Sequence, residues 1–147
     1  MTAWLLDVNV LIGLADSAHT HHARALGWFE QHGVEGWATC PLTENGFVRI
    51  LSDRKYPNLS LSPDQAVDLL ARLKRSRTGR HEWWPDDVSI TDRSLFQTEV
   101  LLGSKQITDA YLLGLAFRKG GGLVSFDSGL PWRAVRDAPA ELLHIIE

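Results

Sequence analysis

Four acidic side chains are candidates for chemistry because of where they fall along the chain. Asp7 follows the apolar segment WLL, and Asp127 follows the apolar segment LVSF. Glu44 lies in the first turn of a predicted helix just after another apolar segment, and Asp109 opens a further helix. In open α/β sheets, ligands bind beyond the carboxyl ends of the strands, where helix N-termini also point. The sequence therefore predicts that the four carboxylates share one rim of a sheet.

A simpler explanation covers only half of this set. A carboxylate in the first turn of a helix is stabilised by the helix dipole, which accounts for Glu44 and Asp109 without any further role. It does not account for Asp7 and Asp127, which end strands. Because acids at strand ends also occur in phosphatases and receiver-like domains, position alone leaves the reaction open.

The expected chemistry follows from the charge of such a cluster. Two ionised carboxylates about 5 Å apart repel by roughly 3 kcal/mol at an effective dielectric of about 20. A cation would relieve this repulsion, and an all-oxygen ligand set without Cys or His selects Mg²⁺ or Mn²⁺. Such ions bridge phosphate oxygens and activate water. Metal-dependent nuclease chemistry is thus the physical expectation for these residues.

The elements that must position the acids alternate between short apolar runs and longer helical patterns. This alternation predicts an α/β fold with a central, mainly parallel β-sheet flanked by helices, forming one domain over residues 1–147. We expect strands at residues 4–6, 36–40, 122–126 and 142–146, and a short one at 81–85. We expect helices at residues 10–15, 20–32, 43–51, 62–73, 94–102 and 108–119, with Thr43 capping the third.

Composition narrows the class of protein without deciding its function. The chain has 147 residues, a net charge of −3 and one cysteine, Cys40, so it has no internal disulfide. Any binding of nucleic acid must depend on a local basic patch, because the overall field is not positive. The N-terminal apolar run is interrupted by Asp7 and Asn9 and has no basic leader. We therefore expect neither a signal peptide nor a membrane anchor, and a cytoplasmic protein.

Basic residues are concentrated in one segment. Residues 72–80 hold five of the 15 Lys and Arg residues, beginning at the end of a predicted helix. The segment either follows the phosphates of RNA or is a solvated surface, and the sequence favours neither. The candidates for contact with RNA phosphates are Arg49, Arg75, Arg77 and Lys105.

Three other features of the sequence could bear on function. The six tryptophans are explained either by core packing or by a groove for a partner peptide. His19, His21 and His22 are better explained as a polar helix start than as a transition-metal site, since further ligands are missing. No histidine stands beside a candidate nucleophilic Ser or Cys, which argues against triad chemistry.

Four segments together resemble the signature segments of PIN domains, in the order and spacing of VapC-type toxins of bacterial toxin–antitoxin pairs. They are LLDVNVLIGLAD at 5–16, LTENGFVRIL at 42–51, ITDAYLLGLA at 107–116 and LVSFDSGL at 123–130. The resemblance covers nearly the whole chain. Each segment is weak evidence alone, whereas four in order are strong.

The resemblance implies roles for individual residues. Asp7, Glu44, Asp109 and Asp127 would bind Mg²⁺, or Mn²⁺ in its place. Asn9 and Ser125 would support them as neighbouring polar groups. Thr108, next to Asp109, would orient that carboxylate or cap its helix. Many relatives carry a further acid shortly after the last aspartate, where this chain has Ser128-Gly129-Leu130. A second metal position would therefore be weak, or would be filled only when RNA supplies oxygens.

The implied activity is that of an endoribonuclease which hydrolyses RNA phosphodiester bonds with a metal-activated water. The resemblance also implies a homodimer, an RNA substrate such as a tRNA, and inhibition by a cognate VapB-type antitoxin that covers the acidic rim. A haloacid-dehalogenase-type phosphatase is disfavoured, because Asn9 stands where that family needs a second aspartate. A catalytically weak PIN-fold module that binds RNA or protein remains the alternative.

Overall fold

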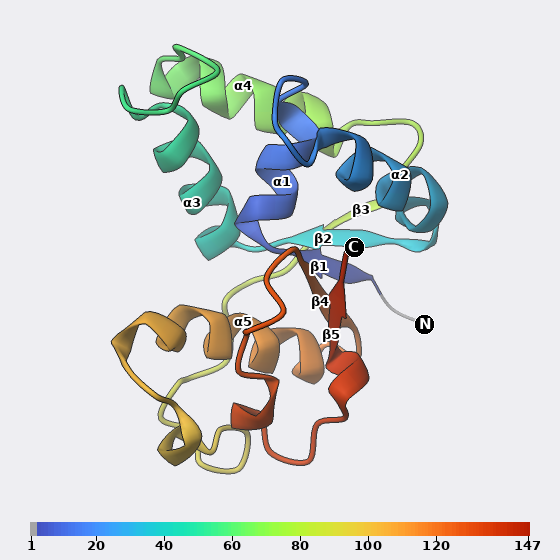
Figure 1. Cartoon of the computed structure of the whole chain (residues 1–147). Coiled ribbons are helices and arrows are strands. Elements are labelled where there is room, and N and C mark those ends of the chain that lie inside the picture. The colour runs from blue at the N-terminus through green and yellow to red at the C-terminus, as the bar shows by residue number, and fades with distance from the viewer. Residues whose placement is uncertain (1–2) are drawn as a thin grey trace.

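The computed structural model describes residues 3–147. Their five β-strands form one parallel sheet (Figure 1). The strands lie in the order β3-β2-β1-β4-β5 and all neighbouring pairs are parallel. The sequence-based prediction of a mainly parallel α/β sheet is confirmed. The strand bounds are β1 Trp4–Leu6, β2 Trp37–Thr39, β3 His81–Trp83, β4 Gly122–Ser125 and β5 Leu143–Ile145.

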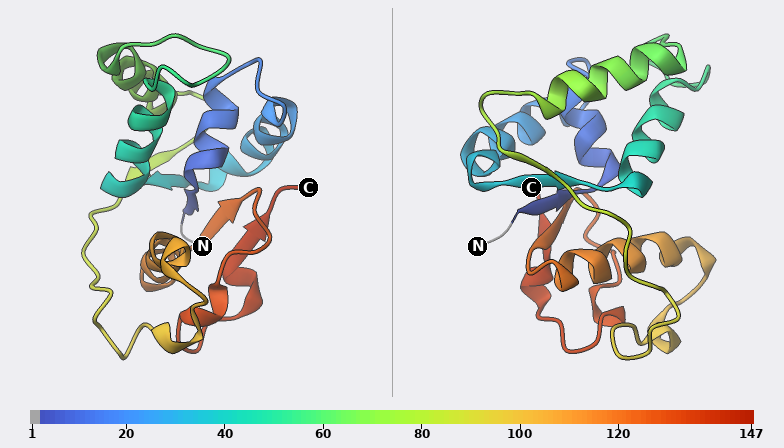
Figure 2. Two further views of the ribbon diagram at one scale, coloured as in Figure 1. Left: turned by 60° about the vertical axis from the view of Figure 1, so that its left-hand side comes forward. Right: turned by 180° about the vertical axis from the view of Figure 1, so that it is seen from behind.

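Helices cover both faces of the sheet. Helices α1 to α4 pack on one face, whereas α5 and the C-terminal segments cover the other (Figures 1 and 2). Successive strand residues point to opposite faces, so Leu5 and Leu123 enter the core beneath α5, while Leu6 and Val124 enter the core beneath α1 to α4. The helix bounds are α1 Val8–Ala15, α2 His22–His32, α3 Pro41–Leu51, α4 Pro63–Lys74 and α5 Ile107–Arg118.

The helix starts follow local sequence signals. Ser62 caps α4 and forms a reciprocal capping box with Gln65, with Pro63 at the first helical position. Helix α3 begins at Pro41, so the prediction that Thr43 is its N-cap is wrong. Thr43 instead lies in the first turn, where its hydroxyl accepts a hydrogen bond from the backbone N–H of Cys40 at 3.0 Å. Proline suits the first helical position, because the N–H group that it lacks has no partner within the helix there.

The helix predicted over residues 94–102 is also wrong. This stretch is a turn followed by a short 3₁₀ segment, Thr98–Val100, and Phe96 forms an isolated antiparallel bridge with Val135. The Phe96 ring is fully buried against Gly114 of α5, in space that any Cβ there would overlap. Leu102 is 91% exposed. Tertiary packing of the aromatic ring therefore overrides the local helical pattern.

Other predicted elements agree with small shifts. The short strand predicted at 81–85 is confirmed as β3, at the edge of the sheet. The helix predicted from residue 20 begins at His22, and its residue Leu26 is 40% exposed. Within residues 3–147, no helix is both long and apolar enough to cross a membrane.

Candidate functional site

Asp7 joins the first strand to the first helix. It directly follows β1 and is the N-cap of α1, where its side chain accepts a hydrogen bond from the backbone N–H of Val8 at 2.8 Å. An aspartate is favoured here because it satisfies an N–H group that the helix leaves unpaired. The cap holds the carboxylate at the carboxyl edge of the sheet.

Ser125, at the end of β4, connects Asp7 to the neighbouring strand. Its buried hydroxyl donates to Asp7 Oδ2 at 2.8 Å and accepts from Asn9 Nδ2 at 3.1 Å and from the backbone N–H of Asp127 at 3.0 Å. Asn9 Oδ1 is buried and has no hydrogen-bond partner among the described residues. Ser125 thus links the ends of β1 and β4 through its hydroxyl. The amide oxygen of Asn9, beside it, has no hydrogen-bond donor among the described residues.

Asp109 completes a group of three aspartates, which we call the aspartate rim: Asp7, Asp109 and Asp127. Burial, then the charges of Asp7 and Asp127, raise the pKa of Asp109 to about 6. The pKa of Asp7 is also raised, mainly by burial and less by Asp127, against the opposing hydrogen bonds from Ser125 and Val8. The three carboxylates therefore share one electrostatic field. No Lys, Arg or His in residues 3–147 forms an ion pair with any of them.

Glu44 lies in the first turn of α3 but has its own partners. Its Oε2 accepts hydrogen bonds from Thr39 Oγ1 and from Lys74 Nζ, both at 2.7 Å. Thr39 Oγ1 also lies 2.8 Å from His81 Nε2. Because the threonine proton is given to Glu44, His81 Nε2 must be the donor to Thr39.

His81 fits this network in its neutral form. Burial, followed by the charge of Lys74, lowers the pKa of His81 to about 4. Its ring lies edge-on to Trp37, with 4.7 Å between the centroids. We call Glu44, Lys74, Thr39 and His81 the glutamate network. Sequence reasoning missed Thr39, Lys74 and His81, because the contacts join α3, α4 and two strands and leave no local signal.

The remaining predicted residues lie outside these hydrogen bonds. Thr108 is exposed and makes no side-chain hydrogen bond to Asp109, and Gln106 stands at the N-cap of α5. Among the described residues, the four predicted phosphate contacts are exposed side chains without ion-pair partners. They are Arg49, Arg75, Arg77 and Lys105.

The histidines near α2 make contacts within the protein. His22 Nδ1 lies 2.8 Å from the carbonyl oxygen of Gly13, and the ring of His21 packs on Phe126 with 4.7 Å between centroids. These contacts tie the start of α2 to α1 and to the segment after β4.

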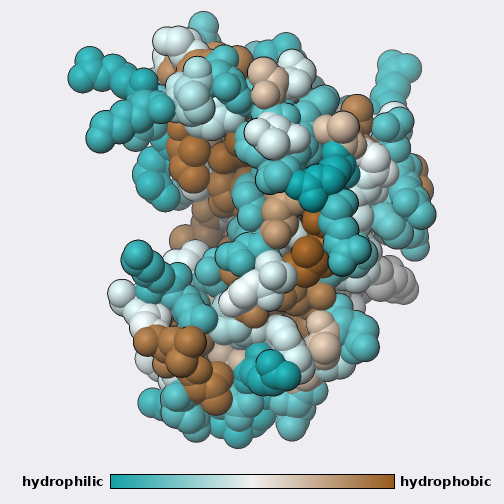
Figure 3. Space-filling model, viewed as in Figure 1, coloured by the Kyte–Doolittle hydropathy of each residue, from teal (hydrophilic) through white to brown (hydrophobic). Residues whose placement is uncertain are grey.

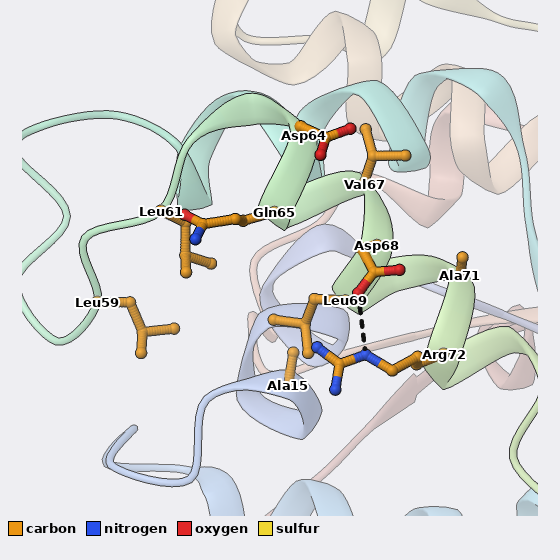
Figure 4. Close-up of a pocket in the computed structure, with 10 residues that line it drawn as sticks. All are labelled: Ala15, Leu59, Leu61, Asp64, Gln65, Val67, Asp68, Leu69, Ala71 and Arg72. Carbon is orange, nitrogen blue, oxygen red and sulfur yellow. Dashed lines mark ion pairs between the residues drawn. The ribbon is translucent and has the colours of Figure 1, made fainter.

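A hollow opens at the carboxyl edge of the sheet, between the layer of α3 and α4 and the segment that leads into α5 (Figure 3). A second cavity, of about 650 Å³, lies elsewhere, beside α4 and the end of α1 (Figure 4). Its charged lining is Asp64, Asp68 and Arg72, and Arg72 Nε pairs with Asp68 Oδ2 at 3.3 Å. None of the predicted metal-binding acids lines it.

The donor set of the aspartate rim fits a hard divalent cation. It offers carboxylate oxygens beside the unpartnered Asn9 Oδ1, and burial, followed by the charges of neighbouring carboxylates, raises the pKa values of Asp7 and Asp109. Oxygen ligands without thiol or imidazole suit Mg²⁺ or Mn²⁺. The fit is one of donor type: within residues 3–147, no group of three or more Asp, Glu, His or Cys side chains is arranged to hold a metal ion.

Comparison with known proteins identifies the family of this fold. The family model for the PIN domain matches residues 4–136. The chain belongs to the PIN-domain family. The resemblance noted in the sequence is thereby confirmed.

The relatives of this PIN domain cover almost its whole length. It is 44% identical over 139 residues to "Ribonuclease VapC44" of Mycobacterium tuberculosis, covering 95% of this chain and 96% of that protein. It is 42% identical over 144 residues to "Ribonuclease VapC38" of the same species, covering 97% and 99%. The crystal structure of VapBC2 from Rickettsia felis, bound to a promoter DNA fragment, matches with a TM-score of 0.58 at 13% identity, over 99% of this chain and 97% of that one. The structural match supports the fold.

Proposed function

We propose that this PIN domain is a metal-dependent endoribonuclease and the toxin of a VapBC-type toxin–antitoxin pair. Relatives that are 42–45% identical over most of the chain are named ribonucleases. The observation that carries the proposal is the aspartate rim, where three carboxylates meet at the sheet edge without a cation among the described residues. Hydrolysis of phosphodiesters is the chemistry that such a rim suits when it is loaded with Mg²⁺ or Mn²⁺.

In this proposal each residue has a defined task. Asp7, Asp109 and Asp127, together with Glu44 from the first turn of α3, would hold the cation. When bound, the ion supplies positive charge to the phosphate and lowers the pKa of a coordinated water. Ser125 fixes the orientation of Asp7 and the backbone of Asp127. Asn9 holds Ser125 in turn and offers its free Oδ1.

The partners belong to the same proposal. The substrate is RNA, such as a tRNA, and the inhibitor is a VapB-type antitoxin that covers the rim. The matched structure from Rickettsia felis is a VapBC complex, which supports a partner of this kind. A homodimer and a cytoplasmic location, both expected from the sequence, complete the proposal.

The test incubates the purified, antitoxin-free chain with total RNA and Mg²⁺ or Mn²⁺, in parallel with EDTA. Asp7→Asn removes a charge from the rim but keeps the cap of α1, because Asn caps helices as well as Asp does. Asp68→Asn is the matched control, since it removes a carboxylate from α4 outside the rim. Discrete fragments are expected with the wild type and the control, and intact RNA with EDTA or Asp7→Asn.

RNA that stays intact in every lane, with a folded protein, would contradict the nuclease proposal. If such a protein still retained RNA in a binding assay, the alternative of a PIN-fold binding module would replace it. Cleavage that persists in EDTA and in Asp7→Asn would contradict the role of the rim.

A further inference from the structure

We propose that Lys74 is a substrate-binding residue of this site. It binds a phosphate of the RNA backbone while it keeps its contact with Glu44, and RNA therefore enters over the α3–α4 side of the rim. This inference rests on the proposed ribonuclease function and names a residue and a direction that the proposal lacks. The glutamate network is its starting point.

The contacts of Lys74 leave it free to bind a second anion. The ammonium group has three donors, and its one recorded hydrogen bond in the described chain goes to Glu44 Oε2. The side chain of Lys74 is 29% exposed and that of Glu44 is 21% exposed, so the pair is open to solvent on one side. Two donors therefore remain for a phosphate while the contact with Glu44 is kept.

The surroundings provide space for such a ligand. A hollow of about 200 Å³ lies between α3 and α4, and its lining includes Glu44, Asn45 and Lys74. Glu44 Oε1 receives no hydrogen bond from any described residue, because Thr39 and Lys74 both bind Oε2. The carboxylate is thus held from one side by the protein, and its other oxygen remains free.

Charge gives this lysine a particular importance. A phosphodiester that approaches the aspartate rim meets three carboxylates, and Lys74 is the cation that the structure places in contact with a predicted site acid. Arg75 and Arg77 follow it in the chain as exposed side chains without ion-pair partners among the described residues. Phosphate contacts by such side chains position RNA without reading its bases. Lys74 is the last residue of α4, Arg75 is its C-cap and Arg77 lies in the turn that follows, so basic side chains continue along the chain from the contact with Glu44.

The experiment measures RNA affinity without cleavage. The full chain is titrated in EDTA at low ionic strength against a short fluorescein-labelled RNA of mixed sequence, and fluorescence polarisation is read over a series of salt concentrations. Lys74→Met removes the charge and keeps the bulk, and Lys74→Arg keeps the charge. Lys119→Met is the matched control: Lys119 pairs with Asp87 at 3.1 Å, is 25% exposed, and follows the last turn of α5, at the opposite end of that helix from Asp109.

We expect Lys74→Met to weaken RNA binding about fivefold to tenfold and to reduce the salt slope by about one phosphate contact. Lys74→Arg should stay within about twofold of the wild type, and Lys119→Met should bind as the wild type does. In Mg²⁺, the loss in Lys74→Met should appear mainly in KM. The double variant Arg75→Gln/Arg77→Gln, at exposed positions that do not endanger the fold, should also weaken binding and lower the slope.

Unchanged affinity and salt slope in Lys74→Met would overturn the inference and leave Lys74 as a counter-ion for Glu44. Unchanged binding by the double arginine variant would overturn the proposed direction of RNA entry. These failures differ from that of the ribonuclease proposal, since a wild-type chain that cleaves RNA keeps that proposal standing whatever Lys74 does. If the wild type neither binds nor cleaves RNA, both proposals fail.

Discussion

Asp7, Asp109 and Asp127 interact electrostatically and have no ion-pair partner among residues 3–147, and burial, followed by the neighbouring charges, raises the pKa values of Asp7 and Asp109. Glu44, in the first turn of α3, has Lys74 at 2.7 Å and accepts a hydrogen bond from Thr39 at the same distance. One region therefore lacks positive charge, and the other carries its own. Carboxylates that follow neighbouring strands are therefore not equivalent, because the side chains around each one determine whether it has an ion-pair partner.

The largest expected effect comes from the region that lacks a cation. Asp7→Asn should reduce RNA cleavage on the order of 100-fold or more, because several kcal/mol of electrostatic stabilisation depend on the loaded rim. The initial rate of cleavage, compared with that of Asp68→Asn, measures it. A loss smaller than about threefold, which corresponds to less than about 1 kcal/mol, would place the working carboxylates elsewhere.

Ser125→Ala tests the hydrogen bonds within the aspartate rim. Removing the hydroxyl frees Asp7 Oδ2 and the backbone N–H of Asp127 at once. Groups that orient metal ligands typically contribute about 10- to 100-fold in metal affinity or activity, and we expect a loss in that range. Calorimetric titration with Mn²⁺ measures the affinity without RNA. Mn²⁺ affinity equal to that of the wild type would show that Ser125 does not orient the ligands.

Thr39→Val tests the paired region in the same way. It should lower cleavage about tenfold, because it removes one of the two donors that hold Glu44 and leaves His81 Nε2 without its acceptor. Thr39→Ser keeps the hydroxyl and should restore most of the rate. If Ser and Val behaved alike, the effect would come from packing in the strand and not from the hydrogen bond.

The smallest effect concerns the stability of the metal-free protein. The folded state raises the pKa of Asp109 from 3.8 to about 6. Between these pH values the folded chain binds more protons here than the unfolded chain, so this group lowers stability as the pH rises. After allowance for solvent screening of a partly exposed group, Asp109→Asn should be more stable by about 1 kcal/mol at pH 7.

Urea unfolding in EDTA at pH 7 and near pH 4 checks this, since the gain should disappear at the lower pH. A gain of equal size at both pH values would assign the effect to something other than the charge. Saturating Mg²⁺ should reverse the order at pH 7, because the ion stabilises the wild-type rim by mass action.

The sequence was most informative where a residue's role depends on its nearest neighbours. Asp7 and Asp127 could be placed at one edge because each follows an apolar segment that forms a strand, Asp7 directly after β1 and Asp127 two residues after β4, and the start of α4 was predictable from Ser62 and Pro63. The helix at 94–102 failed because Phe96 packs on Gly114, which is 18 residues away in the chain. The sequence identifies the basic segment that contains Lys74 but not its contact with Glu44. That contact spans 30 residues and depends on how α3 and α4 pack.

The packing of Phe96 on Gly114 also constrains how this chain can vary. Gly114 lies in the middle of α5, where glycine lowers helix stability by about 1 kcal/mol relative to alanine. The aromatic ring occupies the place of the missing side chain, so neither residue can be exchanged for a larger one alone. The two positions act as one unit of fixed total volume. An alanine at 114 becomes acceptable only with a smaller residue at 96, and natural variants should therefore change these positions as a pair.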